Sequence, residues 1–320
     1  MLIRSRRNLS DVHVARSLLK RAKAEFPRDV RLLSEQAVLE NYPQPEPACN
    51  EDPQSYPAVE VVVCVYNALD QTRACLEALS HSTATEFITI VDDASEEGVH
   101  EFLLQYTAKA PGRRLLKNET NQGYTKSANR GLKSARADWV VLLNSDTLVT
   151  TGWLDGLLRC ALSDPRIRAV GPMSNSAKFQ SLPWCDEAMT ANHVESQAAL
   201  VRKLSARAYP RVPILNGFCL MLHRPTLDNV GHLDEVNFPI GYGEENDLCL
   251  RLLVAGHQLA IADDVYVYHS RSASFGCEKR KAFSENATET LKRLWSGYSY
   301  RYVTDVIEEL PAIRRLKRVQ

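Results

Sequence analysis

The feature that most constrains the fold is a regular alternation of apolar runs and helical segments between residues 59 and 171. The first run, VEVVVCVYN at 59–67, is rich in β-branched residues, as buried parallel strands are. Further strands are predicted at 86–95, 113–117, 138–143 and 167–171, and helices between them at 70–81, 97–109, 124–136 and 151–162. This order predicts an α/β fold with a doubly wound, mostly parallel sheet flanked by helices on both faces.

The two ends of the chain show a different sequence pattern. Apolar residues recur at helical spacing in 11–25 and 29–41, with FPR between them, so a helical hairpin is expected over 1–41. Because one hairpin cannot bury its own face, it must pack on the main domain, on another copy or on a region outside this chain. Five prolines between 42 and 58 predict a linker over 42–57. The main domain is then 58–277, and 278–320 is expected to be a C-terminal helical extension.

Later in the main domain the pattern predicts a strand over 213–224, a helix over 246–256 and a strand over 258–268. The 320 residues carry a formal net charge of +0, so the composition implies no attraction to nucleic acid. None of the eight cysteines forms a C-x-x-C pair, and most stand in apolar stretches, which indicates reduced, buried thiols. No secretion signal and no membrane-spanning run is visible, so a cytoplasmic location is expected.

Acidic residues stand where predicted strands end. Asp92 and Asp93 follow FITIV, and Asp146 follows WVVLL after Asn144 and Ser145. Glu244 and Glu245 open a predicted helix, and His269 follows the strand residues VYVY. Taken singly, each acid has a structural reading as a helix cap or turn residue, and the histidine has one as a satisfied structural residue. In doubly wound sheets ligands bind at the carboxyl ends of strands, so together they predict a site at that edge.

The motifs, in this order, resemble the family 2 inverting glycosyltransferases with the GT-A fold. The resemblance covers roughly 58–277. The segments that carry it are VVVCVYN, VDDAS, NQGYTKSANRG (121–131), LLNSDT, NGFCLMLHR, GYGEENDLCLRLLVAGH and VYHSRSASFG. No glycine-rich phosphate loop follows the first strand and no G-x-G-x-x-G follows any strand, which excludes a nucleotidyltransferase and a nicotinamide-dependent dehydrogenase.

The resemblance implies a role for each candidate site residue. The catalytic base would be Glu245, with Glu244 as the competing assignment. The metal, Mg²⁺ or Mn²⁺, would be held by Asp146 and His269, while Asn144 stands where the family usually has a second aspartate. Acceptor-binding residues would be Asn216, Gly217 and Trp184, the last with core packing as its alternative. Donor-binding residues would be Tyr66, Asn67, Asp92, Asp93, Gly123, Asn129, Asn144 and Ser145.

The expected function is transfer of a sugar from a UDP- or dTDP-linked donor to a hydroxyl of a glycan or lipid-linked glycan. The hexosyltransferase-like enzymes of bacterial surface polysaccharide synthesis, including O-antigen, are the nearest analogy, with rhamnosyl- and galactofuranosyl-transferases as examples. The basic, aromatic C-terminal helices would either pack on the sheet or rest on the inner face of the membrane, and the hairpin could dock a partner enzyme. The alternative function is a non-catalytic nucleotide- or glycan-binding module that docks a partner through its hairpin.

Overall fold

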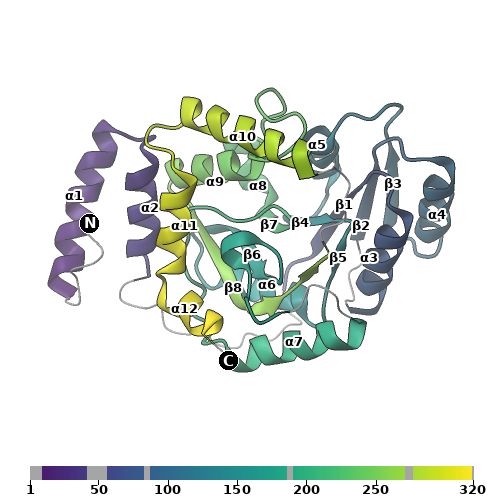
Figure 1. Cartoon of the computed structure of the whole chain (residues 1–320), viewed down its shortest axis with the longest axis horizontal. Coiled ribbons are helices and arrows are strands. Elements are labelled where there is room, and N and C mark those ends of the chain that lie inside the picture. The colour runs from purple at the N-terminus through teal and green to yellow at the C-terminus, as the bar shows by residue number, and fades with distance from the viewer. Residues whose placement is uncertain (1–8, 42–55, 83–86, 186–189, 271–276, 319–320) are drawn as a thin grey trace.

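The computed structural model describes residues 9–41, 56–82, 87–185, 190–270 and 277–318. Its centre is a seven-stranded sheet with the strand order β3-β2-β1-β4-β7-β6-β8 (Figure 1). The strands are β1 (Val59–Val65), β2 (Phe87–Asp92), β3 (Arg113–Lys117), β4 (Trp139–Asn144), β6 (Ile167–Met173), β7 (Cys219–His223) and β8 (Gln258–Tyr266). β7 runs antiparallel to both of its neighbours, and the other adjacent strands are parallel. The predicted mostly parallel α/β sheet is confirmed.

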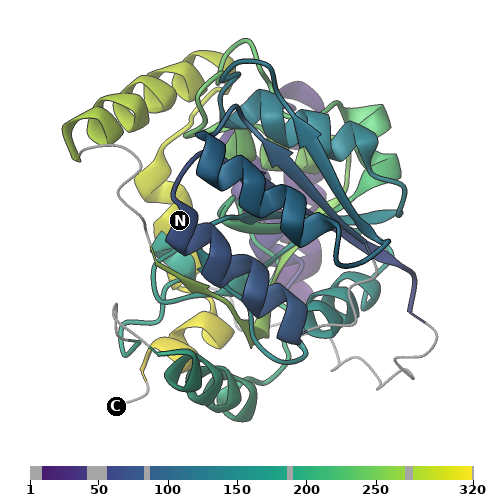
Figure 2. The same ribbon diagram turned by 90° about the vertical axis from the view of Figure 1, so that its right-hand side faces the viewer.

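Helices cover both faces of the sheet, as Figures 1 and 2 show. They are α3 (Leu69–Ser82), α4 (Glu97–Thr107), α5 (Tyr124–Ser134), α6 (Trp153–Leu162), α7 (Ala191–Leu204), α8 (Arg224–Val230) and α9 (Glu244–Val254). Alternate residues of a strand point to opposite faces, so β1 contributes to two cores. Val61 and Val63 pack with α3, α4 and α6, whereas Val62 packs with α5, α8 and α9.

Helix α5 approaches β1 closely because residue 131 is a glycine. A β-carbon at Gly131 would lie 2.2 Å from Cγ1 of Val62, which no real side chain tolerates. The close approach positions the start of α5, and with it Gly123, beside the carboxyl ends of β1 and β2. Gly123 itself has φ +83 and precedes the helix as its N-cap.

A two-stranded ribbon lies beside the carboxyl edge of the main sheet. It pairs β5 (Thr147–Leu148) with β9 (Tyr268–His269), with Thr147 opposite His269. The sequence pattern does not predict this ribbon, because two residues are too few to show a period. Its consequence is that the loop after β4 and the end of the β8 segment, more than one hundred residues apart, come together.

The N-terminal hairpin packs on the main domain. It consists of α1 (Leu9–Glu25) and α2 (Val30–Leu39), and α2 contacts α9 and α11 (Tyr300–Glu308). The Val30 amide donates to the Ser296 carbonyl over 2.9 Å, and the Tyr302 hydroxyl donates to Glu35 over 2.8 Å. Of the three packing arrangements expected from sequence, contact with the main domain is therefore found for α2.

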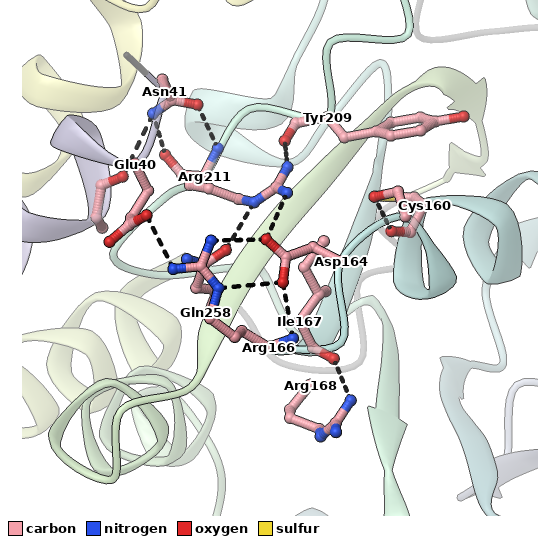
Figure 3. Close-up of polar contacts among 12 residues, drawn as sticks. Glu40, Asn41, Cys160, Asp164, Arg166, Ile167, Arg168, Tyr209, Arg211 and Gln258 are labelled. Carbon is pink, nitrogen blue, oxygen red and sulfur yellow. Dashed lines mark hydrogen bonds and ion pairs between the residues drawn. The ribbon is translucent and has the colours of Figure 1, made fainter. Parts of the chain in front are cut away.

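A polar network joins the end of α2 to β8, the strand at the edge of the sheet opposite β3 (Figure 3). The Asn41 side-chain amide accepts from the Arg211 N–H over 2.7 Å and donates to the Arg211 carbonyl over 3.0 Å. The buried Arg211 guanidinium in turn donates to Gln258 of β8 over 2.9 Å and reaches Asp164 at 3.5 Å. The hairpin is thus joined to the strand that leads to His269.

Some boundaries differ from the predictions. The strand expected over 213–224 begins only at Cys219, because residues 216–218 form a turn in which the Phe218 N–H donates to Asn216 Oδ1 over 3.2 Å. The C-terminal part is helical, as expected, and contains α10 (Cys277–Leu294), α11 and an additional short helix, α12 (Pro311–Lys317). Six cysteines are free thiols, of which Cys64 is half-buried and the others are buried: Cys64, Cys75, Cys160, Cys185, Cys219 and Cys249. Among the described residues, no helix combines the length and apolar character required to cross a bilayer.

Candidate active site

Asp146 and His269 meet across the β5–β9 ribbon. The imidazole Nε2 lies 3.3 Å from the Asp146 Oδ1, and both side chains are mostly buried. The other ring nitrogen, Nδ1, lies 3.0 Å from the Ser176 carbonyl oxygen, which can only accept. Nδ1 therefore carries a proton, and the Nε2 of a neutral ring presents a lone pair toward the carboxylate.

Two acceptors facing each other at this distance require a proton or a metal ion between them. A histidine whose far nitrogen donates to a backbone carbonyl is the arrangement found at metal sites, because that bond fixes the tautomer and ring orientation. The residues present therefore fit a divalent cation. The described part of the chain holds no cluster of three or more His, Cys, Asp or Glu groups suited to a metal, so other oxygen ligands would complete the shell.

Asn175 fixes the backbone around His269. Its side-chain amide donates to the His269 carbonyl over 3.1 Å and accepts from the His269 N–H over 2.8 Å. Neither Asn175 nor Ser176 was predicted from sequence. The segment that follows the β6 strand shows no motif, and its role arises only from its position against the ribbon.

Glu244 and Glu245 stand at the first turn of α9 and share one donor. The Gly243 N–H lies 2.9 Å from Oε2 of Glu244 and 3.1 Å from Oε2 of Glu245. Gly243 has φ +147, and a β-carbon there would lie 2.9 Å from the Phe238 ring, so only glycine can present this amide. The bifurcated contact brings two carboxyl groups together where the helix N-terminus favours negative charge.

The environment of the pair favours one proton and one charge. Burial, followed by the charge of Glu245, raises the pKa of Glu244 to about 8. Burial also raises the pKa of Glu245, against the lowering effect of the Lys178 ammonium and of backbone N–H groups. Because like charges held this close resist simultaneous ionisation, the pair titrates in two coupled steps. A carboxylate with a raised pKa is a better proton acceptor near neutral pH.

The turn at 216–218 joins the glutamate pair to the Asp146–His269 pair. Gly217 lies against Glu245, since a β-carbon placed on it would be 3.4 Å from the Glu245 β-carbon. The Phe218 ring stacks on the His269 imidazole with centroids 5.1 Å apart and planes at 15°. The Phe218 carbonyl also accepts from the Asn144 N–H over 2.8 Å. The two pairs of titratable groups are therefore held on either side of one short turn.

Asp93 organises the loop before α5. Its Oδ1 accepts from the Asn118 side chain over 2.6 Å and from the Gln122 N–H over 2.8 Å. Its Oδ2 accepts from the Gly123 N–H over 2.9 Å. A carboxylate has about four acceptor positions, so three of them are occupied and one on Oδ2 is left for another donor.

The other residues on the donor side divide into paired and exposed ones. Asp92 is fully buried, and its oxygens accept from the Ser95 N–H at 2.9 Å and lie 2.6 Å from the His100 ring. Asn67, at φ 57, accepts from the Glu96 N–H over 2.8 Å and so ties the end of β1 to α4. Tyr66 is 49% exposed at the end of β1. Asn144 and Ser145 are half-buried in the loop that leads to Asp146.

Two candidates have their polar groups committed elsewhere. The buried Asn129 donates to the Leu233 carbonyl over 2.8 Å and to Glu235 over 2.7 Å, and it accepts from the Leu233 N–H over 3.0 Å. It therefore holds the loop after α8 rather than offering its amide to a ligand. The Trp184 indole N–H donates to the Leu316 carbonyl over 2.8 Å, and the ring packs against the core. These contacts match the alternative prediction for Trp184, which is core packing, and the packing is against the end of α12.

Several relatives of this chain carry glycosyltransferase names. It is 27% identical to the N-acetylglucosaminyl-diphospho-decaprenol L-rhamnosyltransferase of Mycobacterium tuberculosis over 68% of this chain and 77% of that protein. It is 32% identical to EpsH of Bacillus subtilis over 33% of this chain, a match that spans only 30% of that protein. It is also 25% identical, over 82% of its length and 63% of the relative, to an inactive polypeptide N-acetylgalactosaminyltransferase-like protein of Mus musculus.

Solved structures share the fold. The mannosyltransferase PcManGT of Pyrobaculum calidifontis, solved with GDP-Man and Mn²⁺, superposes with a TM-score of 0.59 at 17% identity, covering 93% of this chain and 80% of that one. GalNAc-T7, solved with UDP, GalNAc and Mn²⁺, gives a TM-score of 0.57 at 17% identity over 83% of this chain and 54% of that one. The sequence family described as glycosyltransferase-like family 2 matches residues 57–286. The chain therefore belongs to the glycosyltransferase-like family 2 and has the GT-A fold.

Proposed function

We propose that this chain is an inverting glycosyltransferase that moves a sugar from a nucleotide-diphosphate donor to a hydroxyl group of an acceptor, with Glu245 as the general base. The observation that carries the proposal is the pairing of the glutamates at the start of α9 with Asp146 and His269 on the other side of the 216–218 turn. A proton acceptor and a candidate anion-stabilising site, separated by one turn, are what transfer of a sugar from a diphosphate requires.

In the proposed reaction Glu245 removes the proton of the acceptor hydroxyl while the hydroxyl oxygen forms a bond to the anomeric carbon. The bond from that carbon to the diphosphate oxygen breaks in the same step, and the diphosphate leaves with the electron pair. Because the nucleophile enters opposite the leaving group, the anomeric configuration inverts. Burial and the Glu245 charge raise the pKa of Glu244 to about 8, so Glu244 keeps its proton near neutral pH and limits the repulsion that Glu245 meets.

Asp146 and His269 would hold a divalent cation, Mg²⁺ or Mn²⁺. Bound there, the cation would neutralise charge on the donor diphosphate. Asp146 and His269 provide only two protein ligands, and Asn144 stands where the family pattern has a second aspartate. Donor phosphate oxygens and water would therefore supply further ligands. Asn144 and Ser145 would hydrogen-bond the donor or a water of the ion.

On the donor side, the exposed Tyr66 ring would stack on the nucleobase, and the remaining acceptor position of Asp93 would accept from a base N–H. Asp92, Asn67 and Gly123 would position this region through their contacts within the protein. Uracil and thymine each carry an imide N–H that can donate to the Asp93 carboxylate, so a UDP- or dTDP-linked donor fits. Asn216 and Gly217 would face the acceptor sugar beside Glu245.

The Mycobacterium tuberculosis relative is named an N-acetylglucosaminyl-diphospho-decaprenol L-rhamnosyltransferase, and this name favours a glycan or lipid-linked glycan acceptor for this chain as well. A hexosyl or deoxyhexosyl transfer in bacterial surface polysaccharide synthesis, at the cytoplasmic side of the membrane, is the setting we propose. Contact of the terminal helices with an anionic membrane or a partner enzyme belongs to the same proposal.

The experiment that tests the proposal is a screen of nucleotide sugars by thermal shift with Mn²⁺ present, followed by transfer assays with lipid-linked and free glycans. A donor that raises the melting temperature only with the metal, and is consumed with an acceptor, supports it. The second candidate is a non-catalytic binding module, which Asn144 and the inactive relative favour. That candidate predicts donor binding but neither transfer nor metal-dependent hydrolysis of any nucleotide sugar.

A further inference from the structure

Asn118 lies between the Asp93 carboxylate and an arginine at the surface. It follows the last residue of β3, and its side chain is buried. Its amide nitrogen donates to Oδ1 of Asp93 over 2.6 Å and to the Ser127 hydroxyl over 2.9 Å. Its amide oxygen accepts from Nη1 of Arg130, an exposed residue of α5. Both polar atoms of the Asn118 side chain therefore have partners within the protein.

The chemistry of these partners fixes which way the amide of Asn118 faces. A guanidinium can only donate, and an ionised carboxylate can only accept. The amide N–H groups must therefore face Asp93, and the amide oxygen must face Arg130. Arg130 is itself anchored, because the same Nη1 donates to the Lys117 carbonyl over 2.6 Å. The orientation of the amide is thus set from both ends.

The two oxygens of Asp93 accept unequal numbers of hydrogen bonds. Oδ1 accepts from the Asn118 amide and from the Gln122 N–H over 2.8 Å, whereas Oδ2 accepts from the Gly123 N–H over 2.9 Å. Each oxygen of a carboxylate offers about two acceptor positions. Among the residues that the structure describes, these donors fill Oδ1 and leave one position, on Oδ2. Asp93 can then accept from one further N–H without losing a bond that it already makes.

Nucleobases differ in the number of donors that they present to such a carboxylate. Uracil and thymine present a single imide N–H, with carbonyl oxygens on either side of it. Guanine presents its N1–H and its amino group side by side, and both need an acceptor. A buried N–H left without an acceptor costs affinity, so a carboxylate with one open position discriminates against guanine.

We propose that Asn118, oriented by Arg130, is a specificity-determining residue for the donor: by filling Oδ1 of Asp93 it restricts this carboxylate to a base with one facing N–H, and so favours uracil or thymine nucleotides over guanine nucleotides. The inference rests on the proposed function in taking Asp93 as the residue that meets the base. Neither Asn118 nor Arg130 is among the site residues that the sequence predicts.

The test is nucleotide selectivity, measured as the dissociation constants of UDP, dTDP and GDP by isothermal titration calorimetry with Mn²⁺ present. The wild type should bind the tighter of the two pyrimidine nucleotides at least about tenfold more tightly than GDP, because guanine leaves one N–H without an acceptor. A wild type that binds GDP as tightly, or that binds none of the three, would overturn the inference.

Asn118→Leu replaces the amide with an apolar side chain of similar size and so frees the second acceptor position on Oδ1 of Asp93. The pyrimidine nucleotides should bind more weakly, since Asp93 loses a donor that holds it in place. GDP should gain relative to them, so the selectivity should fall by about tenfold. Equal weakening of all three nucleotides would show that Asn118 only supports the loop, which contradicts the inference.

Arg130→Met tests the orientation of the amide without changing a buried residue. The Asn118 oxygen loses its charged donor, so the selectivity should fall in the same direction as in Asn118→Leu, by a smaller factor. Arg130→Lys keeps a donor and should restore most of the selectivity. The matched control is Lys126→Met, at another exposed position of α5, which should leave the selectivity unchanged. Wild-type selectivity in Arg130→Met would overturn the inference, and this variant decides the question if Asn118→Leu does not fold.

These binding measurements separate the inference from the proposed function. Selectivity that depends on Asn118 and Arg130, in a protein that transfers no sugar, would support the inference while the proposed function fails. Sugar transfer by a protein whose selectivity is the same in the wild type, Asn118→Leu and Arg130→Met would leave the proposed function standing and overturn the inference.

Discussion

Gly217 lies directly against Glu245, with the position of an added β-carbon 3.4 Å from Cβ and 3.5 Å from Cγ of the glutamate. The backbone of Gly217 does not have a positive φ, so conformation does not require glycine here. A methyl group would meet the stem of the proposed base at ordinary van der Waals distance, whereas a larger side chain would press on it. The position of the Glu245 carboxylate therefore depends on the size of residue 217.

Gly217→Val is expected to lower kcat about tenfold or more, because side-chain atoms beyond a β-carbon would press on the Glu245 stem and small displacements of a reacting group cost rate steeply. The melting temperature and donor binding should change little, since the turn keeps its hydrogen bonds. The matched control is Gly98→Val in α4, where an added β-carbon meets nothing within 4 Å. Wild-type kcat in Gly217→Val would show that the Glu245 side chain is not the base or adjusts freely.

His269→Ala should abolish the stabilisation that Mn²⁺ gives in the presence of a nucleotide diphosphate. The pair has one imidazole and one carboxylate, so the loss of either leaves too few protein ligands. Thermal shift with and without Mn²⁺ measures this. His81→Ala, at the exposed end of α3, serves as the control. If His269→Ala keeps the full metal-dependent shift, the ion binds elsewhere.

Glu244→Gln should become more stable relative to the wild type as pH rises from 5 to 8. The folded-state pKa of Glu244 is raised to about 8, so the folded protein binds more protons than the unfolded chain between the ordinary carboxyl pKa and that value. Stability therefore falls with rising pH over this window, and the neutral amide removes that fall. Melting temperatures across this range check it. A constant difference between the two proteins would contradict the raised pKa.

Asn41→Ala should lower the free energy of unfolding by about 1–3 kcal/mol. The substitution leaves the buried N–H of Arg211 without its acceptor, which is the costly direction for a hydrogen bond. Chemical denaturation measures the change, and Asn192→Ala on the exposed side of α7 is the control. An unchanged stability would show that the hairpin is held without this contact.

The sequence predicts the sheet because β-branched runs bounded by helices have few other solutions. It does not predict that β7 runs antiparallel, since periodicity carries no strand direction. The helical hairpin at 9–39 is predicted from residue spacing. Its contact with α9 and α11 depends on tertiary packing, which spacing does not encode. The division into domains remains a prediction, and most of the expected linker lies outside the described residues.

For the site, sequence predicts the acids because they stand alone at the ends of apolar runs. The partners that give them properties carry no such signal. Phe218 and Asn175 matter through contacts with His269, from segments without a motif. Asn129 lies in a family motif, and Trp184 is a candidate for stacking on an acceptor sugar. Both side chains nevertheless make their hydrogen bonds within the protein. Local chemistry suggests candidates, and only packing decides which polar atoms are left for a ligand.

The most direct measurement of the central claim is the transfer rate of Glu245→Gln with a donor identified by thermal shift. The amide keeps the size of the side chain and cannot accept the acceptor proton, so kcat should fall by about 10²–10⁴-fold. The donor and Mn²⁺ should still raise the melting temperature as in the wild type, because the Asp146–His269 pair is untouched. A Glu245→Gln protein that binds the donor and transfers sugar at the wild-type rate would contradict Glu245 as the base.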